Sequence, residues 1–171
     1  NKIGELFGND TSDFVLDEVA YDAGAIEWTM QMIGVPIYMD DRGLRDMRTT
    51  AAYGDFKMGT LTQAVEPIFR SKKKASVTAV ASLRCREKDQ YRLYWSDGTG
   101  LTVYLGRKKP EAIPFDLDKV VHATCSAEDS NGDEVMYFGS TDGYVYQLDK
   151  GTSFDGSAID AALIGSAYLL P

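Results

Sequence analysis

The sequence predicts an all-β fold built from repeated antiparallel hairpins. Four times along the 171 residues, a run of alternating apolar residues meets an acidic or Gly-containing turn and continues as a second strand. Asp-Gly between such runs is a strong hairpin signal, because Gly adopts the positive φ that the turn requires and Asp tolerates it. The four copies lie within Glu5–Leu16, Ile37–Leu44, Arg92–Gly98 and Val135–Tyr146.

The spacing of these copies favours a β-propeller-like array. Hairpin units that recur at about 40 residues are typical of propellers, in which stacked sheets bury one another's faces. The aromatic residues Phe7, Tyr38, Tyr94 and Tyr137 mark the four copies and are separated by 31, 56 and 43 positions. Because the spacing is unequal, we expect an incomplete or degenerate array of about four hairpin repeats, with the blade number open.

Residues 1–156 are expected to form the repeat domain. Residues 157–171 are small and apolar, and they are predicted to be either a closing strand or the start of a following domain. The chain opens at Asn1 in a strand-like segment, which suggests a piece of a longer polypeptide. Alternation predicts strands near residues 2–8, 13–20, 25–33, 35–40, 43–49, 76–86, 90–96, 100–106, 119–127, 133–139, 143–149 and 157–169.

One segment departs from the strand pattern. Leu61, Val65, Ile68 and Phe69 fall at helical spacing behind a capping residue, Thr60. The sequence therefore predicts one short helix near residues 60–69. This helix accounts for the long interval between the second and third hairpins, and it would either cover an exposed sheet edge or form a contact surface.

The composition argues against membrane and nucleic-acid binding. No stretch approaches the ~20 apolar residues of a membrane span. Twenty-six acidic against 18 basic residues give a formal charge of -8, which repels nucleic-acid phosphates at long range. The basic clusters Lys72–Lys74 and Arg107–Lys109 are interpreted as solvated turns, because no aromatic side chains alternate with them.

The two cysteines are predicted to be free and buried. Cys85 and Cys125 each share the parity of the apolar residues before them, which indicates inward-facing positions on strands. Similar positions in neighbouring sheets would lie about 10 Å apart, which is too far for a disulfide.

No residue pattern indicates catalysis. The single histidine, His122, lies within a predicted strand, and no Gly-x-Ser-x-Gly sequence is present. Many carboxylates fall in predicted turns, where hairpin chemistry explains them without an acid-base pair. We therefore expect no catalytic residues. The turn carboxylates are Asp10, Asp40, Asp41, Asp97, Asp129, Asp133 and Asp142.

The best metal candidate is the loop of residues 129–133. Its alternating oxygen-bearing side chains around Gly132 resemble the first half of a calcium loop, but Gly139-Ser140 stand where the bidentate Glu should be. A polar hairpin explains the loop as well, so cation binding stays open and no metal ligand is assigned. Gly98-Thr99-Gly100 lacks the third glycine of a nucleotide-binding loop, and no cofactor is expected.

The apolar face of the predicted sheets gives a predicted core. Replacement of Tyr137 with Ala should destabilise the fold by about 3 to 5 kcal/mol if this aromatic residue is fully buried. The core residues are Leu93, Tyr94, Val135, Tyr137, Val145, Leu148, Ile37, Leu44 and the face from Val77 to Leu83. Trp28 is also expected to pack in a core, although Tyr21, Trp28, Tyr53 and Phe56 could form an interaction patch.

The order of the turn motifs also carries a resemblance. The chain resembles bacteriophage virion proteins of the tail and head-to-tail connecting region, similar to short-tailed phage nozzle proteins that contain a β-propeller. The resemblance covers nearly the whole chain, and its last two segments are the most specific. The segments are Gly8–Phe14, Asp41–Leu44 followed by Tyr53–Phe56, Tyr94–Gly100, Phe138–Asp149 and Gly151–Gly156.

The resemblance implies a non-enzymatic structural component of a virion, assembled in the bacterial cytoplasm. It implies a homo-oligomeric ring that contacts other virion proteins, with DNA passing through passively and no sequence-specific binding. Two other classes stay open. A cellular or prophage-encoded interaction module would expose aromatic and Arg side chains, and a carbohydrate-active propeller enzyme would bring carboxylates together in a central cleft.

Overall fold

The computed structural model describes residues 3–20, 24–53, 61–106 and 109–159 of the chain. Antiparallel strands predominate in these ranges. The helices are α1 (Met47–Tyr53), the 3-10 helix η2 (Gln63–Val65) and α2 (Glu66–Lys74). The strands are β1 (Ile3–Phe7), β2 (Val15–Ala20), β3 (Gln31–Ile33), β4 (Val35–Met39), β5 (Leu44–Asp46), β6 (Ala79–Cys85), β7 (Gln90–Trp95), β8 (Thr99–Tyr104), β9 (Glu111–Asp116), β10 (Val121–Glu128), β11 (Glu134–Ser140), β12 (Val145–Gln147), β13 (Ser153–Phe154) and β14 (Ser157–Ala158).

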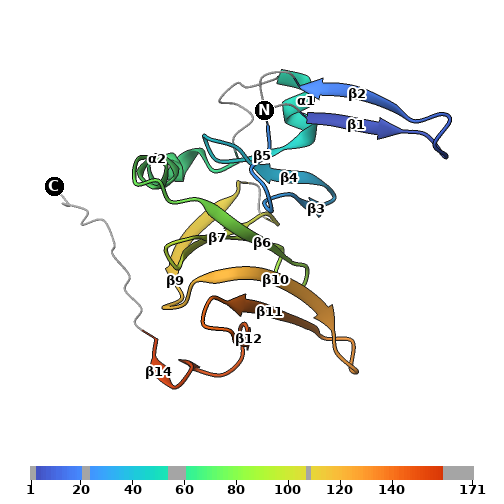
Figure 1. The fold of residues 1–171 in the computed structure, drawn as a ribbon. Helices are drawn as coiled ribbons and strands as arrows, with labels where there is room; N and C mark the ends of the chain where they lie inside the picture. Colours follow the sequence, from blue (N-terminus) through green and yellow to red (C-terminus); the bar gives the residue numbers. More distant parts are fainter. Residues whose placement is uncertain (1–2, 21–23, 54–60, 107–108, 160–171) are drawn as a thin grey trace.

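Three antiparallel sheets are stacked in the order in which the chain forms them (Figure 1). They are the first sheet (β3-β4-β5), the central sheet (β6-β7-β8-β9) and the third sheet (β10-β11-β12). Consecutive strands pair in every sheet, because tight turns join them and no crossover is needed. The mostly-β fold of repeated hairpins is therefore confirmed.

The propeller arrangement is not decided by these sheets. The described residues form no closed ring or barrel. Of the four predicted hairpins, three supply neighbouring strands of the stacked sheets, namely β4-β5, β7-β8 and β11-β12. The first predicted hairpin, β1-β2, forms a separate two-stranded sheet instead.

Two apolar cores lie on either side of the central sheet. Toward the first sheet, Leu93 and Trp95 pack with Ile37 and Leu44. Phe69 of α2 joins this core with its ring edge-on to Trp95, the two ring centroids being 5.9 Å apart. The apolar side of α2 therefore packs on the stacked sheets, and its basic side faces away from them.

The second core lies between the central and third sheets. Leu83 and Tyr94 meet Met136 and Phe138 there, and the Tyr94 ring contacts the edge of Phe115. Because alternate residues of a strand face opposite sides, β7 supplies both cores and is buried along its whole length.

Neighbouring sheets approach most closely at their first strands, β3, β6 and β10. Ser82 of β6 connects them. Its carbonyl oxygen accepts hydrogen bonds from Gln31 Nε2 (3.0 Å) and Thr124 Oγ1 (2.8 Å), and its hydroxyl donates to the Trp28 carbonyl oxygen (2.7 Å). One buried serine therefore fixes the three sheets relative to one another.

The short helix predicted near residues 60–69 is confirmed in part, since helical residues extend from Gln63 to Lys74. The main helix, α2, begins at Glu66 and ends at Lys74, so Pro67 lies in its first turn, where a missing N–H costs nothing. The basic run Lys72–Lys74, predicted as a turn, forms the last helical turn, where cations interact favourably with the helix dipole. A further helix, α1, takes the place of the end of the strand predicted at 43–49. Thr60 lies outside the described residues.

Strand β9 was not predicted. Pro114 lies in its centre, and proline cannot donate a hydrogen bond to a strand ladder. The structure places β9 at the edge of the central sheet, paired only with β8, where the missing N–H would face outward. In the predicted tail, Ser157 and Ala158 form β14, which pairs with β13 in a short hairpin. Residues 160–171 of the tail lie outside the described residues.

The predicted core is confirmed in the first and central sheets and is wrong in part of the third. Leu93, Tyr94, Ile37, Leu44 and Leu148 are buried, as are Ala81 and Leu83. Val77 and Ala79 are half-buried and pack on the first core instead, because the register shifts between Ala79 and Ala81. Val135 and Tyr137 are only half-buried, and Val145 is 74% exposed. The third sheet buries the residues of opposite parity, Met136 and Phe138, because that face packs on the central sheet, whereas no described sheet covers the other face.

Candidate functional site

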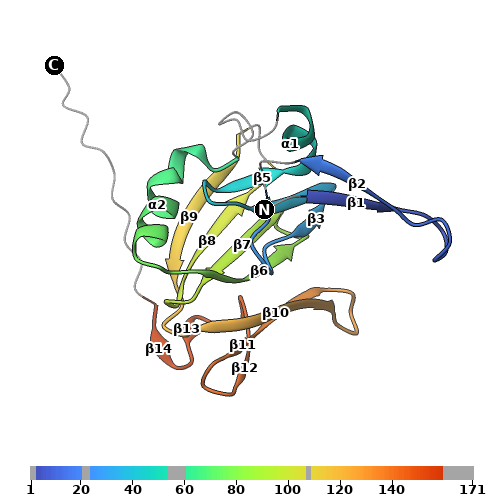
Figure 2. The same ribbon diagram turned by 45° about the horizontal axis from the view of Figure 1, so that its top comes forward.

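The hairpin β1-β2, here called the arm, projects from the side of the stacked sheets (Figure 2). Its strands pair Leu6 with Leu16 and Phe7 with Val15. All four side chains are at least half exposed, with Leu16 the most exposed at 69%. An isolated two-stranded hairpin is marginally stable in water, so an arm with apolar side chains on both faces is a candidate binding element.

The tip of the arm is held by local hydrogen bonds. Asp13 Oδ1 accepts the N–H groups of Asn9 and Asp10, both at 2.9 Å, and Asp10 Oδ1 accepts that of Ser12 at 2.7 Å. The pKa of the Asp10 carboxyl group is lowered mainly by the Ser12 hydroxyl, which donates to Asp10 Oδ1, and that of the Asp13 carboxyl group is lowered by the two backbone N–H groups. Gly8 has a φ of 132°, where a Cβ would lie 2.8 Å from the Asp13 carbonyl oxygen. The turn is therefore specified by its own residues.

One face of the third sheet is not covered by any other described sheet. Tyr137 and Val135 point to this side, opposite Met136 and Phe138, and their cross-strand partners Cys125 and Ala127 share it. Val145 of β12 lies on the same face, opposite Gly139. Small and apolar residues on a sheet face are typical of a surface on which another sheet packs.

This uncovered face corrects the cysteine prediction. Both thiols are free, as predicted, but only Cys85 is buried, while Cys125 is exposed. In both strands, the alternation of side chains places the cysteine on the face that is directed toward the next sheet in the stack. The central sheet has such a neighbour and the third sheet has none among the described residues.

A hollow of about 840 Å³ follows the first strands of the three sheets, and its lining includes Trp28, Met30 and His122. The expectation that Trp28 packs in a core is wrong, since this side chain is 77% exposed with a φ of 62°. Of the residues that line this hollow, Glu27 is the only acidic one. Tyr21 and Phe56 lie outside the described residues, and the Tyr53 side chain is not described.

The turn carboxylates have structural partners, as predicted. Asp40 Oδ1 accepts the N–H groups of Arg42 (2.8 Å) and Gly43 (3.0 Å) in the β4-β5 turn. The same pattern, a carboxylate accepting the N–H two residues ahead, recurs at Asp97 and Asp142. Such Asx turns close the hairpins of all three sheets.

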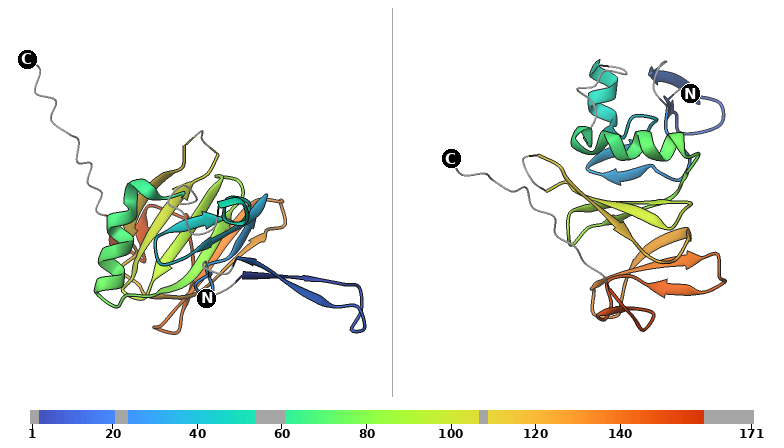
Figure 3. Two further views of the ribbon diagram at one scale, coloured as in Figure 1. Left: turned by 90° about the horizontal axis from the view of Figure 1, so that it is seen from above. Right: turned by 90° about the vertical axis from the view of Figure 1, so that its left-hand side faces the viewer.

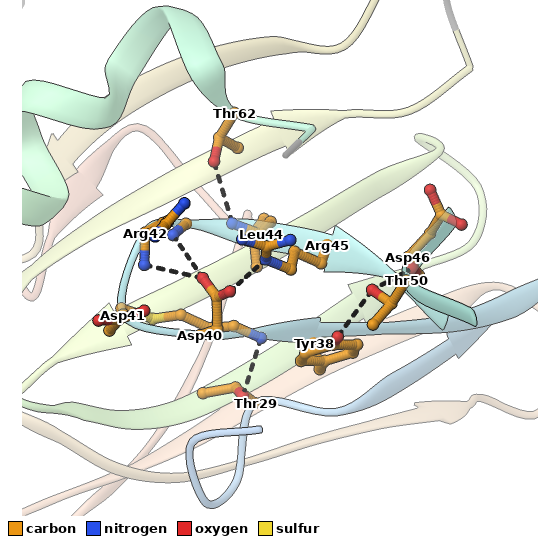
Figure 4. Close-up of polar contacts among 12 residues, drawn as sticks. Thr29, Tyr38, Asp40, Asp41, Arg42, Leu44, Arg45, Asp46, Thr50 and Thr62 are labelled. Carbon is orange, nitrogen blue, oxygen red and sulfur yellow. Dashed lines mark hydrogen bonds and ion pairs between the residues drawn. The ribbon is translucent and has the colours of Figure 1, made fainter. Parts of the chain in front are cut away.

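Burial of Asp40 was not predicted. It is 3% exposed and forms an ion pair with Arg45, which is inaccessible to solvent (Figure 4). Tyr38 lies beside them and hydrogen-bonds Thr50 of α1 at 2.8 Å, and burial raises the pKa of the Tyr38 hydroxyl. α1 therefore covers the polar side of the first sheet, opposite the apolar side that faces the central sheet.

A second ion pair joins the central and third sheets. Arg92 contacts both carboxylate oxygens of Asp149, at 2.9 Å from Nη1 and 2.6 Å from Nη2, and also donates to Gln90 Oε1. The Arg92 hydrogen bonds lower the pKa of Asp149 to about 2. The sequence carried no signal for this pair, since its members are 57 residues apart.

The Arg92–Asp149 pair lies at the wall of a cavity of about 410 Å³. The cavity is bounded by the central sheet, the third sheet and the β13-β14 hairpin, and its aromatic lining includes Phe115, Phe138, Tyr146 and Phe154. Phe138 and Tyr146 are stacked with centroids 5.1 Å apart. The cavity therefore continues the second core toward the edge of the stack.

The loop of residues 129–133 forms the β10-β11 turn. Asp129 Oδ1 accepts the N–H groups of Asn131 (2.7 Å) and Asp133 (3.1 Å), and Gly132 has a φ of 86°. Within the described part of the chain, no group of three His, Cys, Asp or Glu side chains is placed to hold a metal ion. The Asp129 carboxylate is thus engaged in the turn.

The basic clusters lie on the outer surface. In α2, Arg70, Lys73 and Lys74 are exposed, whereas Lys72 is partly covered and pairs with Asp97 at 2.6 Å. Lys109 is also exposed, and residues 107–108 are outside the described ranges.

No family model matches the chain, and neither the curated proteins nor the solved structures contain a significant match to it. Among the described residues, no helix is long and apolar enough to cross a membrane.

Proposed function

We propose that this chain is a structural component of a bacteriophage tail or head-to-tail connector, in which its stacked sheets form a rigid, propeller-type scaffold. The observation that carries the proposal is the set of hydrogen bonds at Ser82, which joins the first strands of three successive sheets. First strands that lie together, each followed outward by a hairpin, are expected for neighbouring blades around an axis.

The uncovered face of the third sheet supports an array larger than three sheets. Its residues Cys125, Val135 and Tyr137 have the same orientation as the central-sheet residues Leu83 and Tyr94, which are covered by the next sheet. A scaffold that adds sheets by repetition would cover this face in the same way.

The carboxylates also support a structural role. Asp40, Asp97 and Asp142 bond to backbone N–H groups of their own turns, and Asp149 is paired with Arg92. These side chains serve the hairpins and the contact between sheets. They do not converge on the hollow beside the first strands, where a glycosidase dyad would be expected.

A protein-interaction module is the second candidate function. Trp28 is 77% exposed beside the first-strand hollow, and exposed Trp residues are enriched at binding hot spots. Such a module would use the same rigid sheets but would function outside a virus particle.

Peptide mass spectrometry of purified phage particles tests the proposal. We expect peptides of this chain in intact particles at several copies per particle, and an antibody against the chain should label the tail end in electron micrographs. A chain that is abundant in the host extract but missing from purified particles would contradict the virion assignment and favour the interaction module.

A further inference from the structure

We propose that the arm of one copy binds the basic outer face of α2 on a second copy, so that copies associate head to tail. This inference deepens the proposed function, since it names the contact through which copies of the scaffold would assemble. It rests on the surface chemistry of the arm and of α2, and on their positions in the molecule.

The arm exposes more apolar surface than a free hairpin can support. Leu6, Phe7, Phe14, Val15 and Leu16 are between 50% and 69% exposed. Together they present on the order of 500 Å² of apolar area, which is the scale of patches that mark interaction sites. A stable interface buries roughly 800 Å² on each partner, so the arm supplies most of one side.

The arm is also strongly acidic. Residues 3–20 contain five carboxylates and no lysine or arginine. Glu5 lies directly opposite Asp17 across the two strands, and both residues are exposed. Like charges at directly opposed positions destabilise a hairpin. A partner that places cations beside this pair would remove the repulsion, so the arm favours a basic partner.

The outer face of α2 has the complementary charge. Arg70 and Lys74 are four residues apart and lie on one side of the helix, with Lys73 next to them. Arg70 pairs with Glu66 at 2.8 Å, but its side chain is exposed, and such a surface pair contributes little. Lys74 forms no ion pair with the described residues. Lys73 pairs with Asp41, but both side chains are more than 60% exposed, and such surface pairs contribute little and exchange readily.

Apolar surface accompanies these cations. Pro67 in the first turn of α2 is exposed, and it lies three and seven residues before Arg70 and Lys74, on the same side of the helix. An acidic hairpin with apolar side chains therefore finds both cations and apolar surface on α2.

The positions of the two surfaces determine how copies would join. The arm and α2 project from opposite sides of the stack, as the view from above shows (Figure 3). The arm is therefore directed away from its own α2. A contact between two different surfaces of identical copies is heterologous, and repetition of it gives a ring or a filament.

The uncovered face of the third sheet is a poorer partner for the arm. The β10-β11 turn beside that face carries Glu128, Asp129 and Asp133, all exposed. These carboxylates would repel the acidic arm. The charges thus distinguish between the two surfaces and favour α2.

Sedimentation velocity of the purified full chain tests the contact. We expect concentration-dependent association at about 50 mM NaCl that weakens toward about 500 mM, because the Debye length shortens. Two double variants, Glu5→Lys with Asp17→Lys and Lys73→Glu with Lys74→Glu, should each raise the Kd of association by about tenfold or more. The quadruple variant, in which both surfaces are reversed, should recover association to within about threefold of the original chain.

Asp133→Lys with Lys150→Glu is the matched control, because it exchanges exposed charges elsewhere and should leave association unchanged. Circular dichroism and melting curves confirm that each variant folds. A monomeric parent chain at low salt, equal weakening by the control, or failure of the quadruple variant to recover would each overturn the contact. So would protection of Cys125 from thiol reagents on association, since it would place the partner on the third sheet. None of these results bears on membership of the virion, which the particle measurement decides separately.

Discussion

The central and third sheets are built by the same rules but have different surroundings. Both are antiparallel hairpin arrays, and both direct a tyrosine from the second strand toward the next position in the stack. Tyr94 of the central sheet is 1% exposed beneath the third sheet, whereas Tyr137 of the third sheet has no sheet above it among the described residues and is only half-buried. The number of covered faces, and not the local sequence, accounts for the difference.

An alignment of the repeats predicts which residues share a face of a sheet, but it does not predict whether that face is covered. Parity along a strand determines which residues share a face. Coverage of that face depends on the next element in space. Tyr38 illustrates the same point in the first sheet, since it is buried under α1 and faces away from the central sheet.

The largest expected difference between the two sheets is the reactivity of their thiols. A single-cysteine chain that keeps Cys125 (Cys85→Ala) should react rapidly with a thiol reagent, because Cys125 is exposed. The chain that keeps Cys85 (Cys125→Ser) should react at least about a thousandfold more slowly, because the reagent reaches the buried Cys85 thiol only when the structure opens. Burial also raises the pKa of the Cys85 thiol, which lowers its thiolate fraction. Equal rates in native buffer would show that the third sheet is covered or the central sheet is open.

Truncation of the two tyrosines should give the next largest difference. Tyr94→Ala is expected to lower the free energy of unfolding by about 3 to 5 kcal/mol, because it leaves a cavity in the second core. Tyr137→Ala should cost about 1 kcal/mol, because its ring is partly in water already. Urea melts followed by circular dichroism measure both values, with Val145→Ala as a surface control. A cost for Tyr137→Ala as large as that for Tyr94→Ala would contradict the uncovered face.

The ion pair between the sheets should appear in the acid dependence of stability. The pKa of Asp149 is lowered from 3.8 to about 2 by Arg92. As pH falls, the Asp149 carboxylate is therefore protonated in the unfolded chain at a higher pH than in the folded chain, which favours unfolding. The stabilisation is therefore present above about pH 4 and is lost between about pH 4 and pH 2. Because Asp149 is partly exposed, we expect about 1 kcal/mol from it.

Asp149→Asn should remove this part of the acid dependence and lower stability at pH 7. Urea midpoints measured at a series of pH values give both quantities. Asp133→Asn, an exposed carboxylate in the β10-β11 turn, serves as the control. If the acid dependence of Asp149→Asn matched that of the parent chain, the Arg92 contact would not connect the sheets in solution.

The smallest effect is expected in the β10-β11 turn at the end of the third sheet. Asp129→Ala removes the side-chain acceptor for two backbone N–H groups but leaves them exposed to water, so it should cost about 0.5 kcal/mol. Calcium should leave the melting temperature of both chains unchanged. A melting temperature that rises with calcium in the parent chain and not in Asp129→Ala would establish a cation site there.

Several elements of the candidate surfaces could be predicted from sequence, and others could not. The hairpin of the arm followed from Gly8, Asn9 and Asp10 between apolar runs. Its projection from the stack could not, because Leu6 and Leu16 have the same pattern as core residues. Strand β9, with Pro114 in its centre, was not predicted. Proline within a strand is tolerated at the edge of a sheet, and the position of an edge is a property of the whole sheet.

By itself, the sequence determined the turns, the hairpins that they close and the parity of each strand. These features depend on contacts between residues a few positions apart, whose energies are set by local φ angles and side-chain hydrogen bonds. Only the tertiary structure decided which faces are covered, that Asp40 and Arg45 are buried together, and that Arg92 reaches Asp149. Those outcomes depend on desolvation by distant segments, and no local pattern encodes where such segments pack.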